Sequence, residues 1–451
     1  MTTQSAVATR SARAELFGSE RRTTTIGLLL LISMIAFEAM GVGTAMPAVV
    51  ADLGVVALYA WPFVAFSAAS VVATVLGGRW CDVAGPRLPL IAAPAVFGAG
   101  LVVAGTATSI AQLLTGRVLQ GLGAGVAVVA AYVLIAAVYP RRVRPAVFGW
   151  MSAAWVLPSL VGPPVAGVVT ERFSWHWVFL GLVPVVLVAL ALVGPATRGL
   201  GAPGDGAAPP RRGLVVAALG AAVGVAGLSW ASQSLSVAGA VAAALALLVL
   251  VPALARLLPA GTIRARRGVP AVVLSRGLLA GTFFAANTYV PLLLTATHGW
   301  SLTAAAVPLV VASLGWSLAS AWQGRHPDLS RPKLLVVGFT LVATGAAALA
   351  LAAPAWGSPW LAFAWLTAGV GMGLGYSAIS YLVLALSAPG DVGFHTSASQ
   401  LADQLSTAAL IGAGGALLVL FVSPAVALPV LLVGLAALAT LGAVLAPRTA
   451  G

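Results

Sequence analysis

The sequence predicts an all-α polytopic membrane protein, and three features of the chain carry this prediction: its composition, its recurring apolar stretches and the placement of its basic residues. Hydrophobic residues make up 61% of the chain and charged residues 7%, and the mean hydropathy is +1.06. A water-soluble globular chain does not tolerate such values. Apolar stretches of about 20 residues recur, each long enough to cross a hydrocarbon core of ~30 Å as a helix.

Hydropathy predicts fourteen spans with short connections. The first is expected to be a retained helix, because it is too long for the core of a signal peptide. The expected spans are 26–49, 58–80, 88–107, 111–139, 145–169, 176–195, 213–232, 236–256, 269–296, 303–323, 333–353, 359–387, 395–421 and 425–447.

The basic residues predict the orientation of these spans. With a cytoplasmic N-terminus, 20 of the 23 Lys and Arg residues fall in cytoplasmic segments, whereas Arg172 falls in an outside loop and Arg117 and Arg276 fall within spans. This asymmetry is what the positive-inside rule requires. We therefore interpret the net charge of +13 as a topology signal, expect both termini in the cytoplasm and expect no nucleic-acid partner.

Two pairs of segments indicate an internal duplication. GRWCDVAGPRL at 78–88 and GRHPDLSRPKL at 324–334 share five residues in register, and GLGAG at 121–125 matches GVGMG at 369–373 in its three glycines. The offsets are 246 and 248 residues, so spans 1–6 correspond to spans 9–14. Parallel repeats of six helices place a substrate path at their interface.

The duplication and the composition divide the chain into segments. The Gly- and Pro-rich stretch 196–212 is expected to be a cytoplasmic linker. The full division is a cytoplasmic arm 1–25, an N-terminal six-helix bundle 26–195, the linker 196–212, two inserted helices 213–256, a cytoplasmic loop 257–268, a C-terminal six-helix bundle 269–447 and a cytoplasmic tail 448–451.

Metal and cofactor chemistry is not expected. Cys81 is the single cysteine and the four histidines are scattered singly, so no disulfide or multi-ligand metal site is predicted. No Walker sequence is present to bind ATP. We expect no enzymatic activity and no cofactor.

A short motif follows the second span. GGRWCDVAGPR places Gly78, Asp82, Gly85 and Arg87 in the expected connection between spans 2 and 3. It resembles the G-x-x-x-D-x-x-G-x-R signature of the major facilitator superfamily. The resemblance implies a gate latch, in which charge-assisted bonds at the membrane face break as the transporter opens. The alternative is that Asp82 and Arg87 are solvated loop charges.

The fourth and fifth spans carry two further family elements. GRVLQGLGAG, which contains Arg117, resembles R-x-x-Q-G-x-G-x-G and implies a role in proton movement; the alternative is an arginine that snorkels to the outer interface. PSLVGPPVAG resembles the antiporter element G-P-x-x-G-G, with Ala166 in place of its penultimate glycine, and the helix-packing residues it supplies are Pro158, Gly162, Pro163 and Gly167.

The entry to the sixth span carries an aromatic element. WHWVFLGLVP at 175–184 resembles W-x-W-x-F-x-x-N-x-P of the fourteen-helix drug/proton antiporters, with Gly181 in place of the asparagine. Trp175 and Trp177 are also expected to anchor the chain at the membrane interface.

Glu38 is the strongest candidate for proton coupling. It lies deep in the apolar first span, where an unpaired carboxylate is costly enough that the group is expected to be protonated part of the time. It precedes Pro47 by the spacing that the acidic residue of the fourteen-helix family keeps from its span-1 proline, although Met40 and Gly43 replace the family's threonine and asparagine. The alternative is a structural carboxyl hydrogen-bonded between helices.

Polar residues in two later spans complete the candidate set. Asp403 is a further proton-coupling candidate that Arg276 would pair with if both lie deep; a peripheral salt bridge is the alternative. The substrate-cavity candidates are Glu38, Met40, Asn287, Tyr289, Gln400 and Gln404.

The resemblance extends over essentially the whole chain, and the span count points to the drug/proton antiporter branch. It implies multidrug efflux: proton influx would drive export of a lipophilic, cationic or amphiphilic compound by alternating access. The expected partners are that small molecule, protons and the bilayer of a bacterial cytoplasmic membrane, with the protein acting as a monomer. Proton-coupled uptake of a metabolite and export of a lipid or natural product are the alternatives.

Overall fold

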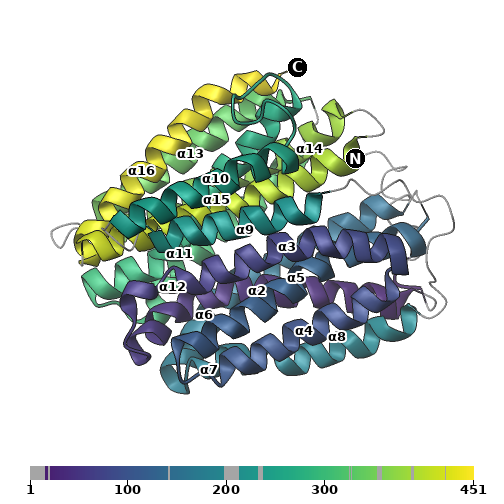
Figure 1. The fold of residues 1–451 in the computed structure, drawn as a ribbon, viewed down its shortest axis with the longest axis horizontal. Helices are drawn as coiled ribbons and strands as arrows, with labels where there is room; N and C mark the ends of the chain where they lie inside the picture. Colours follow the sequence, from purple (N-terminus) through teal and green to yellow (C-terminus); the bar gives the residue numbers. More distant parts are fainter. Residues whose placement is uncertain are drawn as a thin grey trace.

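The computed structural model describes residues 16–18, 21–140, 143–197, 213–231, 237–324, 326, 328–352, 358–387, 391–421 and 423–450. These residues form long helices joined by short turns, with no β-strand in the part described (Figure 1). Thirteen helices are long and apolar enough to cross a membrane. One further helix, α6, is 29 residues long, so every expected span coincides with helical structure.

The helix bounds lie within a few residues of the expected spans. The first group is α2 (Arg22–Asp52), η1 (Val56–Leu58), α3 (Trp61–Ala84), α4 (Arg87–Gly105), α5 (Ile110–Val138), α6 (Arg144–Arg172), α7 (His176–Leu180) and α8 (Val183–Ala196). The middle pair is α9 (Leu214–Ala231) and α10 (Val237–Leu257). The last group is α11 (Val269–His298), α12 (Leu302–Gly324), α13 (Arg331–Ala352), η2 (Pro359–Ala364), α14 (Trp365–Leu386), α15 (Val392–Phe421), α16 (Pro424–Leu445) and η3 (Ala446–Thr449).

The expected spans 176–195 and 359–387 are not continuous α-helices. The span 176–195 is interrupted after Leu180, and α8 begins at Val183 with a proline in its first turn, where its missing N–H costs no hydrogen bond. The span 359–387 opens with the 3₁₀ turn η2 before α14 starts at Trp365.

The two groups of helices pack in the same way. The fourth helix of each group, α5 or α14, lies against the second and third helices of its own group. A methyl group added at Gly121 would meet the α3 backbone and one at Gly123 the α4 backbone, whereas Gly369 meets α12 and Gly371 meets α13. The glycines aligned by the 248-residue offset therefore make equivalent close helix contacts in the two halves.

The middle pair of helices covers the seam between the groups. α9 packs against both α3 and α15, and α10 packs against α9 (Figure 1). α9 packs through small residues such as Ala218 and Ala221, which are fully buried. α10 leaves large apolar side chains such as Leu248 exposed, as expected for a lipid-facing helix. Residues 198–212 of the predicted linker lie outside the described residues, and the domain limits given above remain predictions.

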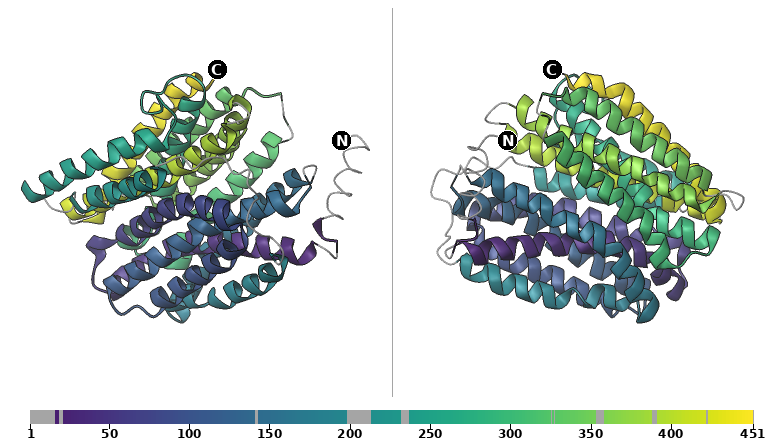
Figure 2. Two further views of the ribbon diagram at one scale, coloured as in Figure 1. Left: turned by 45° about the vertical axis from the view of Figure 1, so that its right-hand side comes forward. Right: turned by 180° about the vertical axis from the view of Figure 1, so that it is seen from behind.

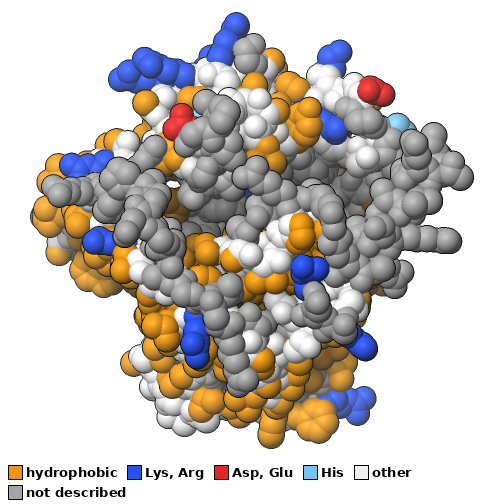
Figure 3. All heavy atoms as spheres, turned by 90° about the vertical axis from the view of Figure 1, so that its right-hand side faces the viewer, with side chains coloured by type: hydrophobic (Ala, Val, Ile, Leu, Met, Phe, Trp, Pro, Cys, Tyr) orange, Lys and Arg blue, Asp and Glu red, His pale blue; other side chains and the backbone are white. Residues whose placement is uncertain are grey.

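One end of the bundle carries many exposed basic side chains. We call it the terminal end, because α2 begins there and α16 ends there. The start of α11 also lies at this end, since the Gly268 amide donates to the Arg448 carbonyl oxygen at 3.0 Å. Exposed arginines at this end include Arg79, Arg87 and Arg256, and Figure 3 shows Lys and Arg side chains distributed around this face.

The two groups of helices also touch at the opposite end, which we call the far end (Figure 2). The hydroxyl of Tyr59, in the turn between η1 and α3, donates to the Thr288 carbonyl oxygen of α11 at 2.8 Å. The rings of Tyr59 and Tyr289 lie 5.3 Å apart, and Tyr289 donates in turn to the Ile411 carbonyl oxygen at 2.6 Å. This chain of aromatic and hydrogen-bonded contacts joins the halves at the far end.

Candidate transport site

A buried ion pair joins the first and fourth helices. Arg117 of α5 donates from Nη1 to Oε1 of Glu38 on α2. Both side chains are excluded from solvent, with 3% of the Arg117 side chain and none of the Glu38 side chain accessible. Arg117 therefore does not snorkel to the membrane surface, and the two proton-coupling candidates of the N-terminal half form one unit.

The arginine of this pair is held on several sides. Its Nε donates to the Pro62 carbonyl oxygen at 3.1 Å and its Nη1 to Oε1 of Gln120 at 3.0 Å. The guanidinium also lies 4.6 Å from the centre of the Phe66 ring, within the range of a cation–π interaction. These fixed partners orient the guanidinium towards the carboxyl.

The carboxyl of the pair is held on one side only. Glu38 Oε1 takes the bond from Arg117 and a weak one from Gln120 at 3.5 Å. Its other oxygen, Oε2, is buried and has no hydrogen-bond partner in the described part of the protein. A buried carboxylate oxygen without a partner is costly, and a proton on Oε2 would relieve part of that cost.

A second ion pair lies in the C-terminal half. Arg276 of α11 donates from Nε to Oδ2 of Asp403 on α15 at 3.0 Å. Gln400 accepts from the same guanidinium at 2.7 Å, and Tyr376 of α14 donates to Asp403 Oδ2 at 3.1 Å while its ring lies 3.4 Å from the guanidinium carbon. The conditional pairing of Arg276 with Asp403 is therefore present.

This second cluster is more open than the first. The Asp403 side chain is 14% accessible and that of Arg276 6%. Both helices that carry this pair also pack against the other half, α11 against α2 and α15 against α3. The second cluster therefore lies on helices at the interface between the two halves.

The C-terminal half holds a neutral counterpart of the first ion pair. Trp365 stands 248 residues after Arg117, the offset of the glycine motifs, and like Arg117 it lies on the fourth helix of its half. Its indole N–H donates to Oδ1 of Asn287 at 3.0 Å, and Asn287 lies on the first helix of that half. The same two helices are thus joined by an ion pair in one half and by an uncharged hydrogen bond in the other.

The remaining cavity candidates have different surroundings. Met40 is half-buried beside Gly162 of α6. Gln404 has a buried Oε1 without a partner in the described residues. Tyr289 is fully used by the far-end contact and is 1% exposed, so its side chain does not line an open cavity.

The predicted gate motif needs one correction. Gly78 and Asp82 do not lie in the connection, because α3 continues to Ala84; the side chain of Asp82 lies outside the described residues. The turn is made at Gly85, whose φ of +73° favours glycine, and Arg87 starts α4 as an exposed side chain.

The antiporter-like element packs helices together. Gly162 lies near Phe37 and Met40 of α2, and Gly167 lies against the backbone of Thr303 on α12. Pro158 and Pro163 both lie inside α6. Close approach at these small residues places α6 in contact with helices of both halves.

The two tryptophans that follow α6, Trp175 and Trp177, differ in exposure and in contacts. Trp175 is buried and donates from its indole N–H to Oδ2 of Asp52 at 3.0 Å. Trp177 is 57% exposed. The interfacial position expected for both therefore fits Trp177, whereas Trp175 ties the end of α2 to the α6–α7 turn.

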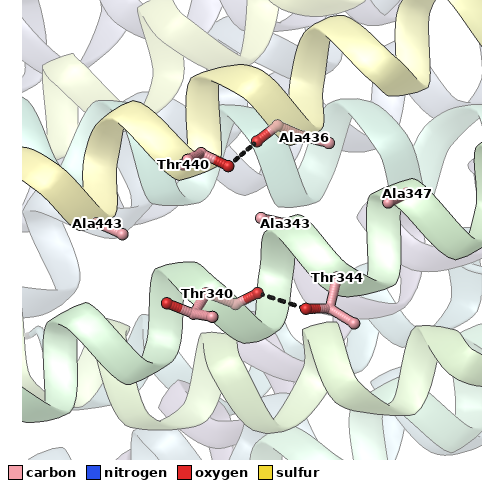
Figure 4. Close-up of a pocket in the computed structure, with 7 residues that line it drawn as sticks. All are labelled: Thr340, Ala343, Thr344, Ala347, Ala436, Thr440 and Ala443. Carbon is pink, nitrogen blue, oxygen red and sulfur yellow. Dashed lines mark hydrogen bonds between the residues drawn. The ribbon is translucent and has the colours of Figure 1, made fainter.

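A separate pocket of about 330 Å³ lies between α13 and α16 (Figure 4). The hydroxyls of Thr344 and Thr440 donate to backbone carbonyl oxygens of their own helices, so the lining presents mainly methyl groups. It contains none of the charged residues described above. No cluster of three or more potential metal ligands occurs among the described residues.

Sequence reasoning missed three of these participants. Trp365 and Tyr376 look like ordinary apolar-helix aromatics, and Tyr59 lies at the edge of a span. Trp365 was detectable, because the 248-residue offset of the glycine motifs aligns it with Arg117. Tyr376 and Tyr59 carry no such signal, since their roles depend on helices that are distant in sequence.

The fold is that of a polytopic membrane protein of two related helical halves, each of which holds an ion pair between its helices. A family model described as Major Facilitator Superfamily matches residues 28–410. The chain belongs to the major facilitator superfamily.

Individual relatives are distant. The chain is 28% identical over 181 residues to a multidrug transporter protein of Bacillus subtilis (strain 168), covering 40% of this chain and 34% of that protein. It is 28% identical over 378 residues to an uncharacterized MFS-type transporter of Mycobacterium tuberculosis, covering 78% of this chain and 53% of that protein. The chain thus spans about half, or less, of the length of these curated relatives.

Solved structures share the fold. A POT family transporter in complex with 5-aminolevulinic acid superposes with a TM-score of 0.70 at 13% identity, covering 96% of this chain and 97% of that one. A peptide transporter POT in complex with sulfate gives 0.69 at 16% identity, covering 94% of each chain.

Proposed function

We propose that this protein is a proton-coupled antiporter that exports a lipophilic, amphiphilic compound. The observation that carries the proposal is the buried Glu38–Arg117 pair, in which Glu38 keeps one oxygen without a partner. A buried carboxyl that is only half satisfied binds or releases a proton in response to small changes around it. Such a group is suited to exchange a proton for a substrate.

The proposed coupling follows from the net charge of the Glu38–Arg117 pair in the two protonation states of Glu38. When Glu38 is ionised, its charge is balanced by Arg117 and the pair is neutral as a whole. When Glu38 is protonated, Arg117 keeps its charge, because a guanidinium does not lose its proton under these conditions, and the site carries one positive charge. Substrate binding that favours the neutral pair therefore expels the proton.

Alternating access would be carried by the contacts between the halves. The far-end contact of Tyr59 with Thr288 and Tyr289 closes one face, and we propose that the far end is the external face. The motif residues Gly78, Asp82, Gly85 and Arg87 lie at the terminal end, where they are proposed to latch the opposite state. Both termini are proposed to be cytoplasmic, in a bacterial cytoplasmic membrane, with the monomer as the working unit.

The test uses inside-out membrane vesicles with an imposed pH gradient, acidic inside. Lipophilic rhodamine dyes are added, and both dye uptake and loss of the gradient are recorded. The wild-type protein is expected to take up dye while the gradient falls. Glu38→Gln is expected to abolish uptake against a gradient, because its side chain cannot exchange a proton.

Asp52→Asn provides the matched control. Asp52 is the other carboxyl of α2, but it lies at the end of the helix and accepts from Trp175. Its substitution is expected to leave gradient-driven uptake intact. Uptake by Glu38→Gln equal to that of the control would refute the proposed coupling. Dye leaving the vesicles together with protons would instead indicate symport.

A further inference from the structure

The charges in the interior of the membrane-spanning helices that the structure describes add up to zero. Within the helices that the structure describes, four charged side chains lie about two turns or more from both helix ends: Glu38, Arg117, Arg276 and Asp403. Each carboxylate is bonded to an arginine. We call these four residues the interior charges.

The charge balance of these four residues affects which net charge a bound substrate can carry. A cation that enters a low-dielectric cavity is stabilised by a negative charge that nothing else neutralises. Neither carboxylate here offers such a charge, because Arg117 and Arg276 already bond Glu38 and Asp403. A bound monocation would leave a net charge of plus one among the interior charges, a bound dication plus two, and a neutral or zwitterionic compound none.

The more accessible of the two ion pairs suits a zwitterion in particular. Asp403 and Arg276 are held side by side at the interface between the halves, with Tyr376 stacked on the guanidinium. Oδ2 of Asp403 accepts hydrogen bonds from both Arg276 and Tyr376. A compound that carries both a positive and a negative group can lie against this charge-neutral cluster without adding net charge to it.

We infer that this transporter prefers neutral or zwitterionic amphiphiles to cationic ones of the same skeleton. The inference rests on the proposed efflux function and replaces the cationic substrate suggested by family resemblance with a compound of zero net charge. Displacing a proton from Glu38 with such a compound returns the interior charges to balance, whereas displacing it with a cation does not.

The experiment compares two dyes that differ in one ester group. Rhodamine B is a zwitterion near neutral pH, and its ethyl ester is a cation on the same ring system. Binding of each to the purified full chain in detergent is followed by fluorescence anisotropy, with protein-free micelles subtracted. Wild type is expected to bind the zwitterion about tenfold more tightly than the ester, a factor that one uncompensated charge at partly screened distances readily supplies.

Variants that unbalance the interior charges test the cause. Arg276→Gln leaves Asp403 uncompensated and is expected to reverse the order, so that the ester binds more tightly. The double variant Arg276→Gln/Asp403→Asn restores balance and is expected to restore the wild-type order. If Arg276→Gln does not yield folded protein, Asp403→Asn alone creates a positive surplus and is expected to weaken ester binding about tenfold relative to zwitterion binding.

Each result decides the inference. Tighter binding of the ester by wild type, or an order that is unchanged by unbalancing the interior charges, would overturn it. Binding of neither dye by any variant would also count against it, since rhodamine B belongs to the preferred class. Because binding at constant pH needs no gradient, this outcome is independent of whether Glu38→Gln abolishes uptake in vesicles.

Discussion

Glu171 of α6 caps the first turn of α12 across the interface between the two halves. Its Oε1 accepts from the Thr303 backbone N–H at 3.0 Å and its Oε2 from the Thr303 hydroxyl at 2.8 Å. A carboxylate at a helix N-terminus satisfies N–H groups that otherwise have no partner and interacts favourably with the helix dipole. One turn earlier, Gly167 lets the backbones approach, because a methyl group there would lie 2.8 Å from Thr303 Cα.

The pH dependence of this contact follows from its hydrogen bonds. Partial burial alone would raise the pKa of Glu171, but bonds from Thr303, Leu302 and Ser301 outweigh it and hold the pKa below its ordinary value. A lowered pKa means that the contact is intact above the usual carboxyl range, near ~4.3, and is lost as the pH falls through the lowered value. We expect the far end to stay closed at neutral pH and to loosen only under strong acid.

Removing the Glu171 charge is expected to loosen the far end at neutral pH as well. Spin labels on cysteines introduced at the exposed Phe173 and Trp360, in a Cys81→Ser background, report the distance between the halves. Glu171→Gln should lengthen and broaden that distance, whereas Arg172→Gln, which alters the adjacent exposed charge, should not. Equal distance distributions for both variants would show that Glu171 does not hold the far end closed.

The glycines of α5 predict a sharp difference in stability. A methyl group at Gly121 would collide with the Phe66 carbonyl oxygen, whereas one at Gly43 of α2 meets nothing within 4 Å. Gly121→Ala is expected to cost about 1–3 kcal/mol through overpacking and to lower the thermal unfolding midpoint of the detergent-solubilised protein. Gly43→Ala should leave the midpoint unchanged or raise it slightly. Equal midpoints would show that α3 and α5 do not pack this closely.

The uncharged hydrogen bond between Trp365 and Asn287 is expected to contribute to stability but not to proton coupling. Trp365→Phe keeps an aromatic ring against Phe283, whose centroid lies 5.2 Å away, but removes the N–H that Asn287 accepts. A loss of about 1 kcal/mol in stability is expected, with substrate-induced proton release unchanged. Proton release that fell as it does in Glu38→Gln would place part of the coupling in the C-terminal half.

The sequence predicted the fold well because the membrane imposes strong rules. Hydropathy marks each span, since backbone groups must be satisfied within a helix, and the glycine repeats GLGAG and GVGMG located the duplication. The breaks at Leu180 and before Trp365 were missed because a short turn inside an apolar run hardly alters hydropathy. The gate motif was wrongly placed in the connection between the helices for a similar reason, since Gly78 is compatible with a helix and only Gly85 requires a turn.

The candidate site was predicted in its parts, but among its pairings only that of Arg276 with Asp403 was anticipated. Glu38 and Arg117 were singled out because a charge in an apolar helix is costly, yet nothing in the chain states that they bond each other across 79 positions. Tyr289 was assigned to the cavity by its polarity, whereas its position on α11 directs it to the far-end contact with Tyr59. Pairings of this kind depend on helix rotation and tilt, which hydropathy does not record.

We propose that substrate displaces a proton from Glu38, and the proton release that accompanies substrate binding measures this displacement directly. The purified protein is placed in weak buffer with a pH-indicator dye, and the rhodamine that best dissipates the vesicle gradient is added. Wild type and the Asp52→Asn control are predicted to release protons in proportion to bound rhodamine, whereas Glu38→Gln is predicted to bind rhodamine without releasing any. Undiminished proton release by Glu38→Gln would contradict the account and make Asp403 the next carboxyl to test.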